Sequence, residues 1–140
     1  MNSAYLRTAL ALLLAPWPSG DAQQASSLQS AQALIREGKP REALPILLET
    51  HRNQPQNPAL CHQIGVAYTQ LQEFSNANRF YRMALALDPR LVPARRNLGV
   101  VLWFSNQKLE AEREFVQVLK AQPDARTALS TSTPLNTVPG

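Results

Sequence analysis

The chain contains one cysteine, Cys61, and two histidines, His51 and His62. A thiol with an imidazole beside it is a pair that can act as nucleophile and base. Cys61 and His62 are adjacent in the sequence, however, and adjacent side chains on a helix point in different directions. The apolar spacing places Cys61 on the packing side of its helix, and His51 belongs to a different helix. We therefore expect Cys61 to be buried, and we predict no thiol catalysis.

Other catalytic arrangements have equally little support. The sequence has no paired carboxylates set for acid–base catalysis, no zinc-ligand spacing and no phosphate-binding loop. Glu110 and Glu114 share one face of a helix, which is ordinary for a solvated surface. A single cysteine also excludes an intramolecular disulfide framework. The sequence therefore predicts a protein that is not an enzyme and that binds no cofactor and no metal.

Length and composition limit the chain to one domain. It has 140 residues, 44% of them hydrophobic, and a formal net charge of +4. The only basic concentration consists of five arginines: Arg79, Arg82, Arg90, Arg95 and Arg96. These could favour an acidic partner or an anionic surface, or they could be the solvated faces of two helices, which is the simpler interpretation. The small charge excess and the lack of a DNA-binding motif argue against nucleic acid as a partner.

An internal repeat indicates the elements that position these side chains. Small residues, alanines and prolines recur in one register with a spacing of 34 residues: Ala31, Gly65 and Gly99; Ala43, Ala77 and Ala111; and Pro55, Pro89 and Pro123. A fixed period of this length is typical of a repeat architecture.

The central repeat has the pattern of two helices. Asn57 is a good N-cap and Pro58 a good first helical residue, so the first helix is predicted over 58–71. Ser75 is expected to cap a second helix, which Pro89 ends because a residue before a proline is disfavoured in the helical conformation.

The small residues of this repeat have a steric explanation. Gly65 and Ala77 would let the two helices approach closely, with Tyr68 and Tyr81 filling the space beside the contact. Glycine inside a helix costs roughly 1 kcal/mol relative to alanine. Its presence at both Gly65 and Gly99 therefore indicates a packing reason.

These residues resemble the tetratricopeptide repeat, whose pattern is Trp-x2-Leu-Gly-x2-Tyr, then Ala-x3-Phe, then Pro. The corresponding residues of the central repeat are Cys61, Ile64, Gly65, Tyr68, Ala77, Tyr81 and Pro89. Those of the third repeat are Arg95, Leu98, Gly99, Leu102, Ala111, Phe115 and Pro123, and those of the weaker first repeat are Ser27, Ser30, Ala31, Leu34, Ala43, Leu47 and Pro55. The resemblance implies an all-α helix-turn-helix solenoid with three repeats, at 24–57, 58–91 and 92–125.

The outer repeats are predicted to contain two helices each. In the third repeat these cover 93–104 and 108–121. In the first repeat a helix over 27–37 follows a polar lead-in, and Pro40 can open the next helix, which ends at Asn53. Pro45 lacks the amide that would bond back to Arg41, so this helix is expected to start late or to bend there.

Residues 1–22 have the pattern of a signal peptide. Arg7 precedes an apolar run, Thr8 to Trp17, that is too short to span a bilayer of roughly 30 Å. Gly20 and Ala22 have the spacing that signal peptidase requires, so cleavage is expected after Ala22. The chain is therefore predicted to be exported, either to the periplasm or as a secreted protein. The alternatives are an uncleaved membrane anchor and a buried first helix.

Residues 126–140 are rich in Ser, Thr and Pro, and are predicted to be disordered. Repeat arrays usually end in a capping helix, and this chain offers at most a short turn at 125–129. Phe115, Val116, Val118 and Leu119 on the last helix would then lack complete cover. They are candidates for self-association into a homo-oligomer or for a partner, unless Leu129 folds back over them or the reading frame is truncated.

The family resemblance implies a concave groove lined by the first helix of each repeat. The residues predicted to contact a partner there are His62, Gln63, Val66, Arg96, Asn97, Val100 and Trp103. A row of three carboxamides, Gln29, Gln63 and Asn97, could bond the backbone of an extended peptide, and Trp103 could supply apolar contact. The alternative is that the amides are simply solvated.

One subgroup of the family holds an acidic C-terminal carboxylate in a clamp of basic and amide side chains. The matching positions here are Leu28, Gln32, Gln63, Pro93 and Asn97, of which only the amides fit. That specificity is therefore not predicted.

The sequence as a whole predicts an exported adaptor or scaffold that binds an extended segment of a partner protein in its groove. The alternative is a structural module that self-associates through its last helix. Contact with a membrane is expected only if the signal segment stays uncleaved.

Overall fold

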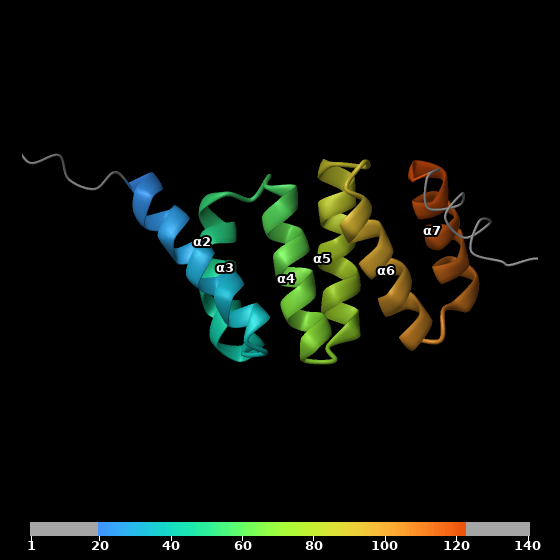
Figure 1. The fold of residues 1–140 in the computed structure, drawn as a ribbon, viewed down its shortest axis with the longest axis horizontal. Helices are drawn as coiled ribbons and strands as arrows, with labels where there is room; N and C mark the ends of the chain where they lie inside the picture. The colour runs from blue at the N-terminus through green and yellow to red at the C-terminus, as the bar shows by residue number, and fades with distance from the viewer. Residues whose placement is uncertain (1–19, 123–140) are drawn as a thin grey trace, which may run out of the picture.

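The computed structural model describes residues 20–122, which form six α-helices and no strand (Figure 1). The helices are α2 (Gly20–Arg36), α3 (Pro40–Asn53), α4 (Pro58–Gln70), α5 (Phe74–Leu87), α6 (Val92–Phe104) and α7 (Lys108–Ala121). They pair as α2 with α3, α4 with α5 and α6 with α7. The prediction of an all-α solenoid of three helix pairs is confirmed.

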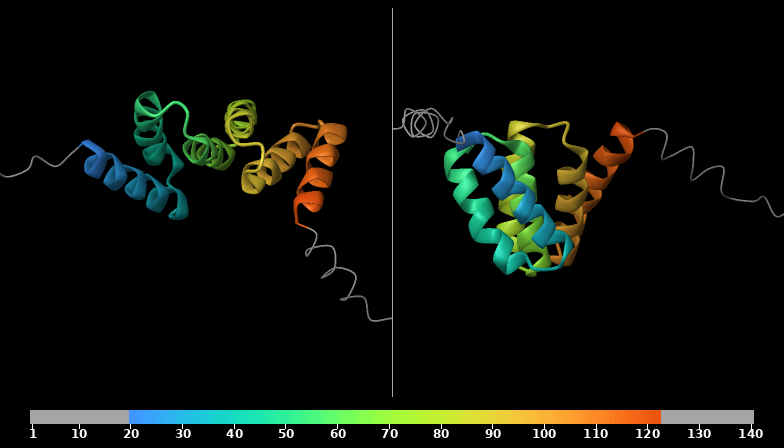
Figure 2. Two further views of the ribbon diagram at one scale, coloured as in Figure 1. Left: turned by 90° about the horizontal axis from the view of Figure 1, so that it is seen from above. Right: turned by 60° about the vertical axis from the view of Figure 1, so that its left-hand side comes forward.

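The helices stand side by side in a row, and each packs mainly on its neighbours in the chain. The first helices of the pairs, α2, α4 and α6, line one face, with α3 and α5 behind them (Figure 2). The predicted groove residues of α4 and α6 therefore lie on neighbouring helices of one face.

Two hydrophobic clusters form the core. One joins the first and second repeats and includes Ala43, Leu47 and Ile64, and the other joins the second and third and includes Tyr81, Leu98 and Leu102. The partly buried side chains of Val66, Tyr68 and Met83 pack against both clusters. The core is therefore continuous along the row of helices.

Two glycines allow the helices of a pair to touch. A Cβ added to Gly65 would lie 2.5 Å from Cε1 of Tyr81, and one added to Gly99 would lie 2.7 Å from Cε1 of Phe115. Both distances are far inside van der Waals contact, so the aromatic ring of the second helix rests directly on the glycine of the first. The predicted packing reason for these glycines is confirmed.

The turn within each pair uses one left-handed residue, and these residues are 34 positions apart. They are Gly38, Gln72 and Asn106, with φ of 72°, 60° and 62°. Glycine and asparagine adopt this conformation readily, whereas glutamine does so at some cost. The repeat in the sequence is thus also a repeat in backbone conformation.

The helix ends agree with the sequence at most places. The side chain of Asn57 accepts a hydrogen bond from the amide of Leu60 at 3.1 Å, as expected of an N-cap. Asp88 has the extended backbone predicted before Pro89. Ser75 does not cap α5, however, because the helix already begins at Phe74 with no side-chain cap.

In the first repeat, the predicted start of the first helix was wrong, and so was one of the two outcomes expected for the second helix. The polar residues 23–27 are helical, because α2 begins at Gly20, and Ser27 and Ser30 donate to the carbonyls four residues before them. Of the two outcomes expected at Pro45, a late start or a bend, the late start does not occur, because α3 runs from Pro40 through Pro45. Pro45 is exposed, so its ring disturbs no buried contact.

The predicted signal peptide and tail fall largely outside the described residues. Residues 1–19 and 123–140 are not described, and the predicted cleavage point after Ala22 falls within α2. Between residues 20 and 122, no helix is both long enough and apolar enough to cross a membrane.

Candidate functional site

A hydrogen bond joins the two central helices of the groove face. Nδ2 of Asn97 on α6 lies 3.1 Å from Nε2 of His62 on α4. Because the amide nitrogen is a donor, Nε2 accepts, and the imidazole is neutral with its proton on Nδ1. Burial, and secondarily the charge of Arg96, lowers the pKa of His62, which favours the same neutral form.

Tyr81 of α5 forms the floor beneath this pair. Its ring is 1% exposed and lies 5.8 Å from the His62 ring. Its hydroxyl lies 3.0 Å from Oγ1 of Thr69, and Thr69 donates to the carbonyl of Gly65 at 2.8 Å. Tyr81 is therefore the donor to Thr69, and burial raises the pKa of the Tyr81 phenol. The ring contact of Tyr81 with His62 and the hydrogen bond of His62 with Asn97 together connect α5, α4 and α6.

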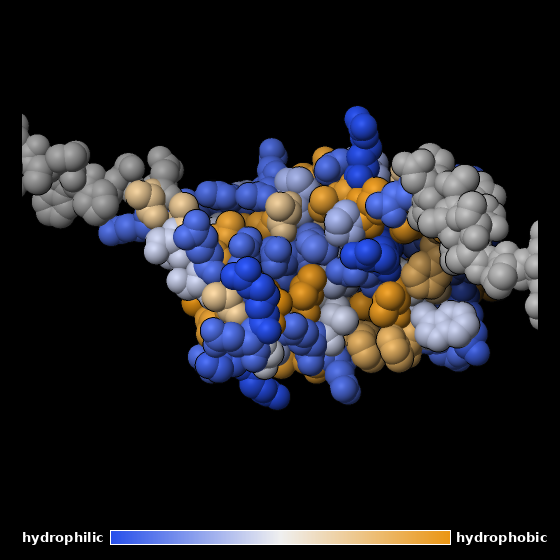
Figure 3. All heavy atoms as spheres, viewed as in Figure 1, coloured by the Kyte–Doolittle hydropathy of each residue, from blue (hydrophilic) through white to orange (hydrophobic). Residues whose placement is uncertain are grey.

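The α6 end of this face is apolar. Val100, Trp103, Phe104 and Phe115 line a pocket of about 370 Å³. Trp103 is 53% exposed and Phe104 66% exposed, although large aromatic side chains are usually well buried. The space-filling view of this face shows hydrophobic atoms gathered toward the α6 end, among hydrophilic ones elsewhere (Figure 3). This pocket gives the groove a place for an apolar side chain.

Two residues of this end were missed by the sequence analysis. Phe104 stacks on Phe74 with ring centroids 5.8 Å apart, and Nζ of Lys108 lies 5.5 Å from the centroid of the Trp103 ring. The sequence did contain a sign of this difference. Phe104 stands 34 residues after Gln70, so an aromatic side chain replaces a polar one at the same position of the repeat.

The other predicted groove residues are less accessible. Gln63 and Val66 are half-buried, and Val66 is part of the core packing. Of the predicted contact residues, Arg96, Val100 and Trp103 are the most exposed.

The five arginines do not form one cluster. Arg82 pairs with Glu110 and Arg95 with Glu114, both at 2.8 Å, so two of them tie earlier helices to α7. Arg79 lies over the ring of Phe80, and Arg96 is exposed on the groove face.

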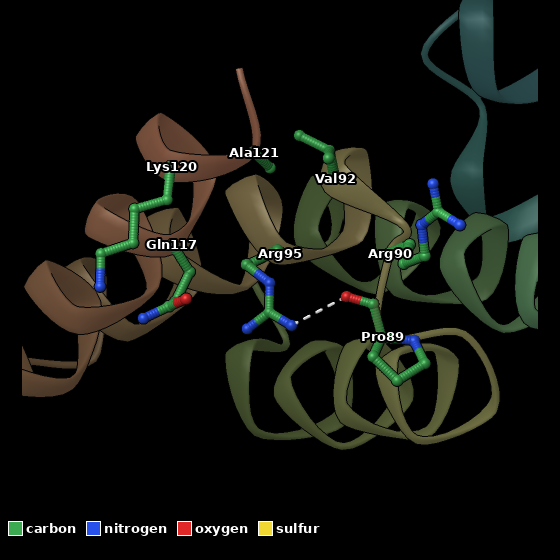
Figure 4. A pocket seen from close by; sticks show the side chains of 7 residues that line it. All are labelled: Pro89, Arg90, Val92, Arg95, Gln117, Lys120 and Ala121. Carbon is green, nitrogen blue, oxygen red and sulfur yellow. Dashed lines mark hydrogen bonds between the residues drawn. The ribbon is translucent and has the colours of Figure 1, made fainter. Parts of the chain in front are cut away.

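A second pocket, of about 320 Å³, lies where the α5–α6 loop meets the end of α7 (Figure 4). Arg90, Arg95 and Lys120 line it, and Arg95 donates to the carbonyl of Pro89 at 3.0 Å. Arg95 already donates to this carbonyl and pairs with Glu114, so its guanidinium has little capacity left for a ligand in this pocket.

Cys61 is buried, as predicted, and burial raises the pKa of its thiol. The structure does bring it beside a histidine, since Sγ lies 3.9 Å from Nδ1 of His51 on α3. This contact was not predicted from the sequence, because it joins residues of two different repeats. The thiol is 0% exposed, so a substrate would have no access to it. No group of three or more His, Cys, Asp or Glu placed to hold a metal occurs in the described part of the chain.

The residues predicted for self-association lie on α7. Phe115 is half-buried against Gly99, whereas Val116 and Leu119 are 42% and 39% exposed.

Comparison with known proteins agrees with this architecture. Residues 58–91 match the family model described as the tetratricopeptide repeat. The RNA polymerase II-associated protein 3 of Rattus norvegicus is 31% identical over 106 residues, which are 74% of this chain and 16% of that protein. The chain thus spans only a small part of this relative.

Similar solved structures include tetratricopeptide repeat (TPR) domains of two proteins that are named RPAP3. The second TPR domain of human RPAP3, in complex with the HSP70 peptide SGPTIEEVD, is 26% identical with a TM-score of 0.68, over 78% of this chain and 94% of that domain. The first TPR of Spaghetti (RPAP3), bound to the HSP90 peptide SRMEEVD, is 27% identical with a TM-score of 0.66, over 71% of this chain and 79% of that one.

MamA from Desulfovibrio magneticus RS-1 has a TM-score of 0.69 at 19% identity, over 71% of this chain and 56% of that one. At this identity the likeness concerns the fold alone. The central helix pair of this chain matches the tetratricopeptide repeat model, and its three pairs together have the tetratricopeptide repeat fold.

Proposed function

We propose that the groove formed by α4 and α6 binds an extended segment of a partner protein, and that the protein acts as an adaptor without catalytic activity. The observation that supports this most is the hydrogen bond between His62 and Asn97, beside the buried ring of Tyr81, which orients the groove amide before any partner arrives. Preorganised groups lose less entropy on binding. The peptides bound by the two RPAP3 domains give the same proposal independent support.

The groove offers two kinds of contact to such a segment. Asn97 keeps hydrogen-bonding capacity beyond its bond to His62, since an amide has two donors and two acceptor sites. One and nearly two turns further along α6, Val100 and Trp103 offer apolar surface. We propose that backbone bonding at Asn97 and one apolar side chain at Trp103 hold the segment.

The segment is proposed to be bound without a free C-terminal carboxylate. Leu28 and Pro93 stand where a clamp for that group needs basic residues, and neither has a charge. Arg96 is the exposed cation nearest to Asn97 in the sequence, and a single exposed cation holds a carboxylate weakly.

We also propose that the chain is exported. The support is the pattern of residues 1–22, in which Arg7 precedes a short apolar run and small residues stand at positions 20 and 22.

Affinity capture from an extracytoplasmic extract of the source cells tests the groove. Three baits are compared: the native chain, a groove variant with Asn97→Ala and Trp103→Ala, and a control with Arg113→Ala and Leu87→Ala. The control changes one polar and one apolar side chain, both exposed and both outside the groove. We expect a protein that the native and control baits capture and the groove variant does not.

Equal capture by all three baits would show that the groove is not the site. The alternative function, a structural module that self-associates, relies on Val116 and Leu119 of α7. Light scattering tests this alternative. A protein that remains monomeric at high concentration would rule out self-association.

A further inference from the structure

The outer face of α7 corresponds to a face of α5, one repeat earlier, that is covered by α6. Phe115, Val118 and Leu119 stand 34 residues after Tyr81, Ala84 and Leu85. Tyr81 and Ala84 are 1% and 0% exposed, and Leu85 packs against the cluster that contains them. On α7, Phe115 and Val118 are only half-buried and Leu119 is exposed.

The element that covers the earlier surface is a helix with one apolar face. The side chains that α6 contributes to the shared cluster are Ala94, Leu98, Val101 and Leu102. Each is at most 1% exposed, and their spacing of 4, 3 and 1 places them on one side of a helix.

The same kind of contact occurs between the first and second repeats. There α4 contributes Leu60, Ile64 and Ala67, at the positions of Ala94, Leu98 and Val101, to the cluster with Ala43 and Leu47 of α3. One type of helix-on-helix interface is therefore used twice, and the face of α7 continues it.

The first helix of a second copy does not offer the matching face. The positions of Ala94 and Leu98 are Ser26 and Ser30 in α2, both exposed. Ser30 donates to the carbonyl of Ser26 in its own helix at 3.0 Å. At the positions of Val101 and Leu102, α2 has Ala33 and Leu34, so a second copy offers two of the four apolar side chains and sets two exposed serines against the rest of the face.

The sequence that follows α7 does not repeat the pattern either. Ala128 and Leu135 stand at the positions of Ala94 and Val101, but Ser132 and Asn136 replace the two leucines, and Pro134 is unfavourable inside a helix.

We propose that the face of α7 formed by Phe115, Val118 and Leu119, with Val116 beside it, binds an amphipathic helix of a partner protein. This helix would take the place against α7 that α6 holds against α5. Its contact side would carry a small residue followed by large aliphatic residues four, seven and eight positions later. This docking face shares Phe115 with the apolar pocket of the groove, whereas Val116, Val118 and Leu119 do not line that pocket.

The test uses the full chain and a synthetic helix of about 18 residues, long enough to form a helix in water. The probe has Ala, Leu, Val and Leu at the spacing of Ala94, Leu98, Val101 and Leu102, with Glu, Lys and Ala elsewhere. A control peptide of equal composition has these four residues distributed around the helix. Fluorescence anisotropy of the labelled peptides measures the dissociation constant, and circular dichroism measures the helix gained.

We expect the patterned peptide to bind with a gain in helicity, and the control peptide not to bind. Leu119→Glu and Val116→Glu should each raise the dissociation constant at least roughly tenfold, because they place a charge in an apolar contact. Leu87→Glu is the matched variant, because Leu87 has a similar exposure, 41%, but lies on α5. It should leave binding unchanged, as should Asn97→Ala in the groove. Circular dichroism of each variant checks that it is folded.

Three results would overturn the proposal. One is equal binding of both peptides, or binding that Leu119→Glu does not weaken. Another is a native dimer in sedimentation that Leu119→Glu dissociates, which would assign the face to a second copy. The third is a tenfold gain in peptide affinity from Leu129→Glu, which would assign the face to the chain's own following residues.

Discussion

At the scale of single residues, the groove depends on a histidine that must remain neutral. His62 accepts a hydrogen bond from the Asn97 amide through Nε2, so a proton on that nitrogen would set two donors against each other. The Asn97 amide would then have to turn, and the groups that the groove offers a partner would change. The protonation state of one imidazole thus controls the polar centre of the groove.

Acid is therefore predicted to weaken the fold through His62. Burial and Arg96 lower its pKa below 6.5, so the unfolded chain takes up a proton at a higher pH than the folded chain. The free energy of unfolding should be unaffected by this group above about pH 6.5 and should decrease as the pH falls from there to the lowered value. Urea unfolding at about pH 7.5, 6.5 and 5.5 measures this, and His62→Gln should flatten the dependence. Parallel losses in the native chain and the variant would assign the pH dependence to another group.

The sequence predicted which side chains point into the core and which point to solvent. It did not predict which side chains of different repeats contact each other. Helical spacing correctly placed Cys61 in the core and Trp103 on the surface. The contact of Cys61 with His51 joins residues of different repeats, and it depends on side-chain orientations that a spacing pattern does not contain. The same holds for the bond between His62 and Asn97.

At the scale of elements, two similar helix contacts differ in how firmly they are held. The ring of Tyr81 on Gly65 is buried and bonded to Thr69 through its hydroxyl, and α6 packs on its other side. The ring of Phe115 on Gly99 has no hydroxyl and is half-buried. The first contact is therefore rigid, while the second has room to adjust.

Alanine at these two glycines should accordingly have different effects. Alanine gains about 1 kcal/mol over glycine within a helix, but overpacking a rigid contact costs about 1–3 kcal/mol. We expect Gly65→Ala to lower the free energy of unfolding by about 1–2 kcal/mol, because Tyr81 cannot move aside. For Gly99→Ala the two terms should nearly cancel, with a change below about 0.5 kcal/mol. Urea unfolding of both variants measures this, and equal losses would show that Phe115 is held as rigidly as Tyr81.

Helix positions could be predicted well from the register, and helix ends less well. The end of α5 at Leu87 and both ends of α7 agree with the sequence, because proline, turn residues and apolar spacing coincide there. The start of α2 was missed because its first residues are small and polar, so apolar spacing gave no signal. The run of α3 through Pro45 was missed because the burial of Ala43 and Leu47 stabilises the helix across a position that is locally unfavourable.

At the scale of the whole molecule, contacts join neighbouring helices almost exclusively. Helices α4 and α5 have a repeat on each side, whereas α2 and α7 have a described neighbour on one side only. In such a row, stability is a sum of the units and the interfaces between them. The middle of the row is therefore the most stable part of the chain.

Amide hydrogen exchange should follow this order. We expect the slowest exchange in α4 and α5 and faster exchange in α2 and α7, because local opening begins where a helix has fewest neighbours. Mass spectrometry of peptic fragments under native conditions measures the order. Protection in α2 as strong as in α4 would show that the row opens as a single cooperative unit.

The three side chains that pack against both clusters have a consequence for binding. Val66 is one of them, and it also lies in the predicted groove. A segment that presses on Val66 would act on the joint between neighbouring repeats and not on one of them alone. Occupancy of the groove would then alter the bending stiffness of the row and so reach residues that the segment never touches.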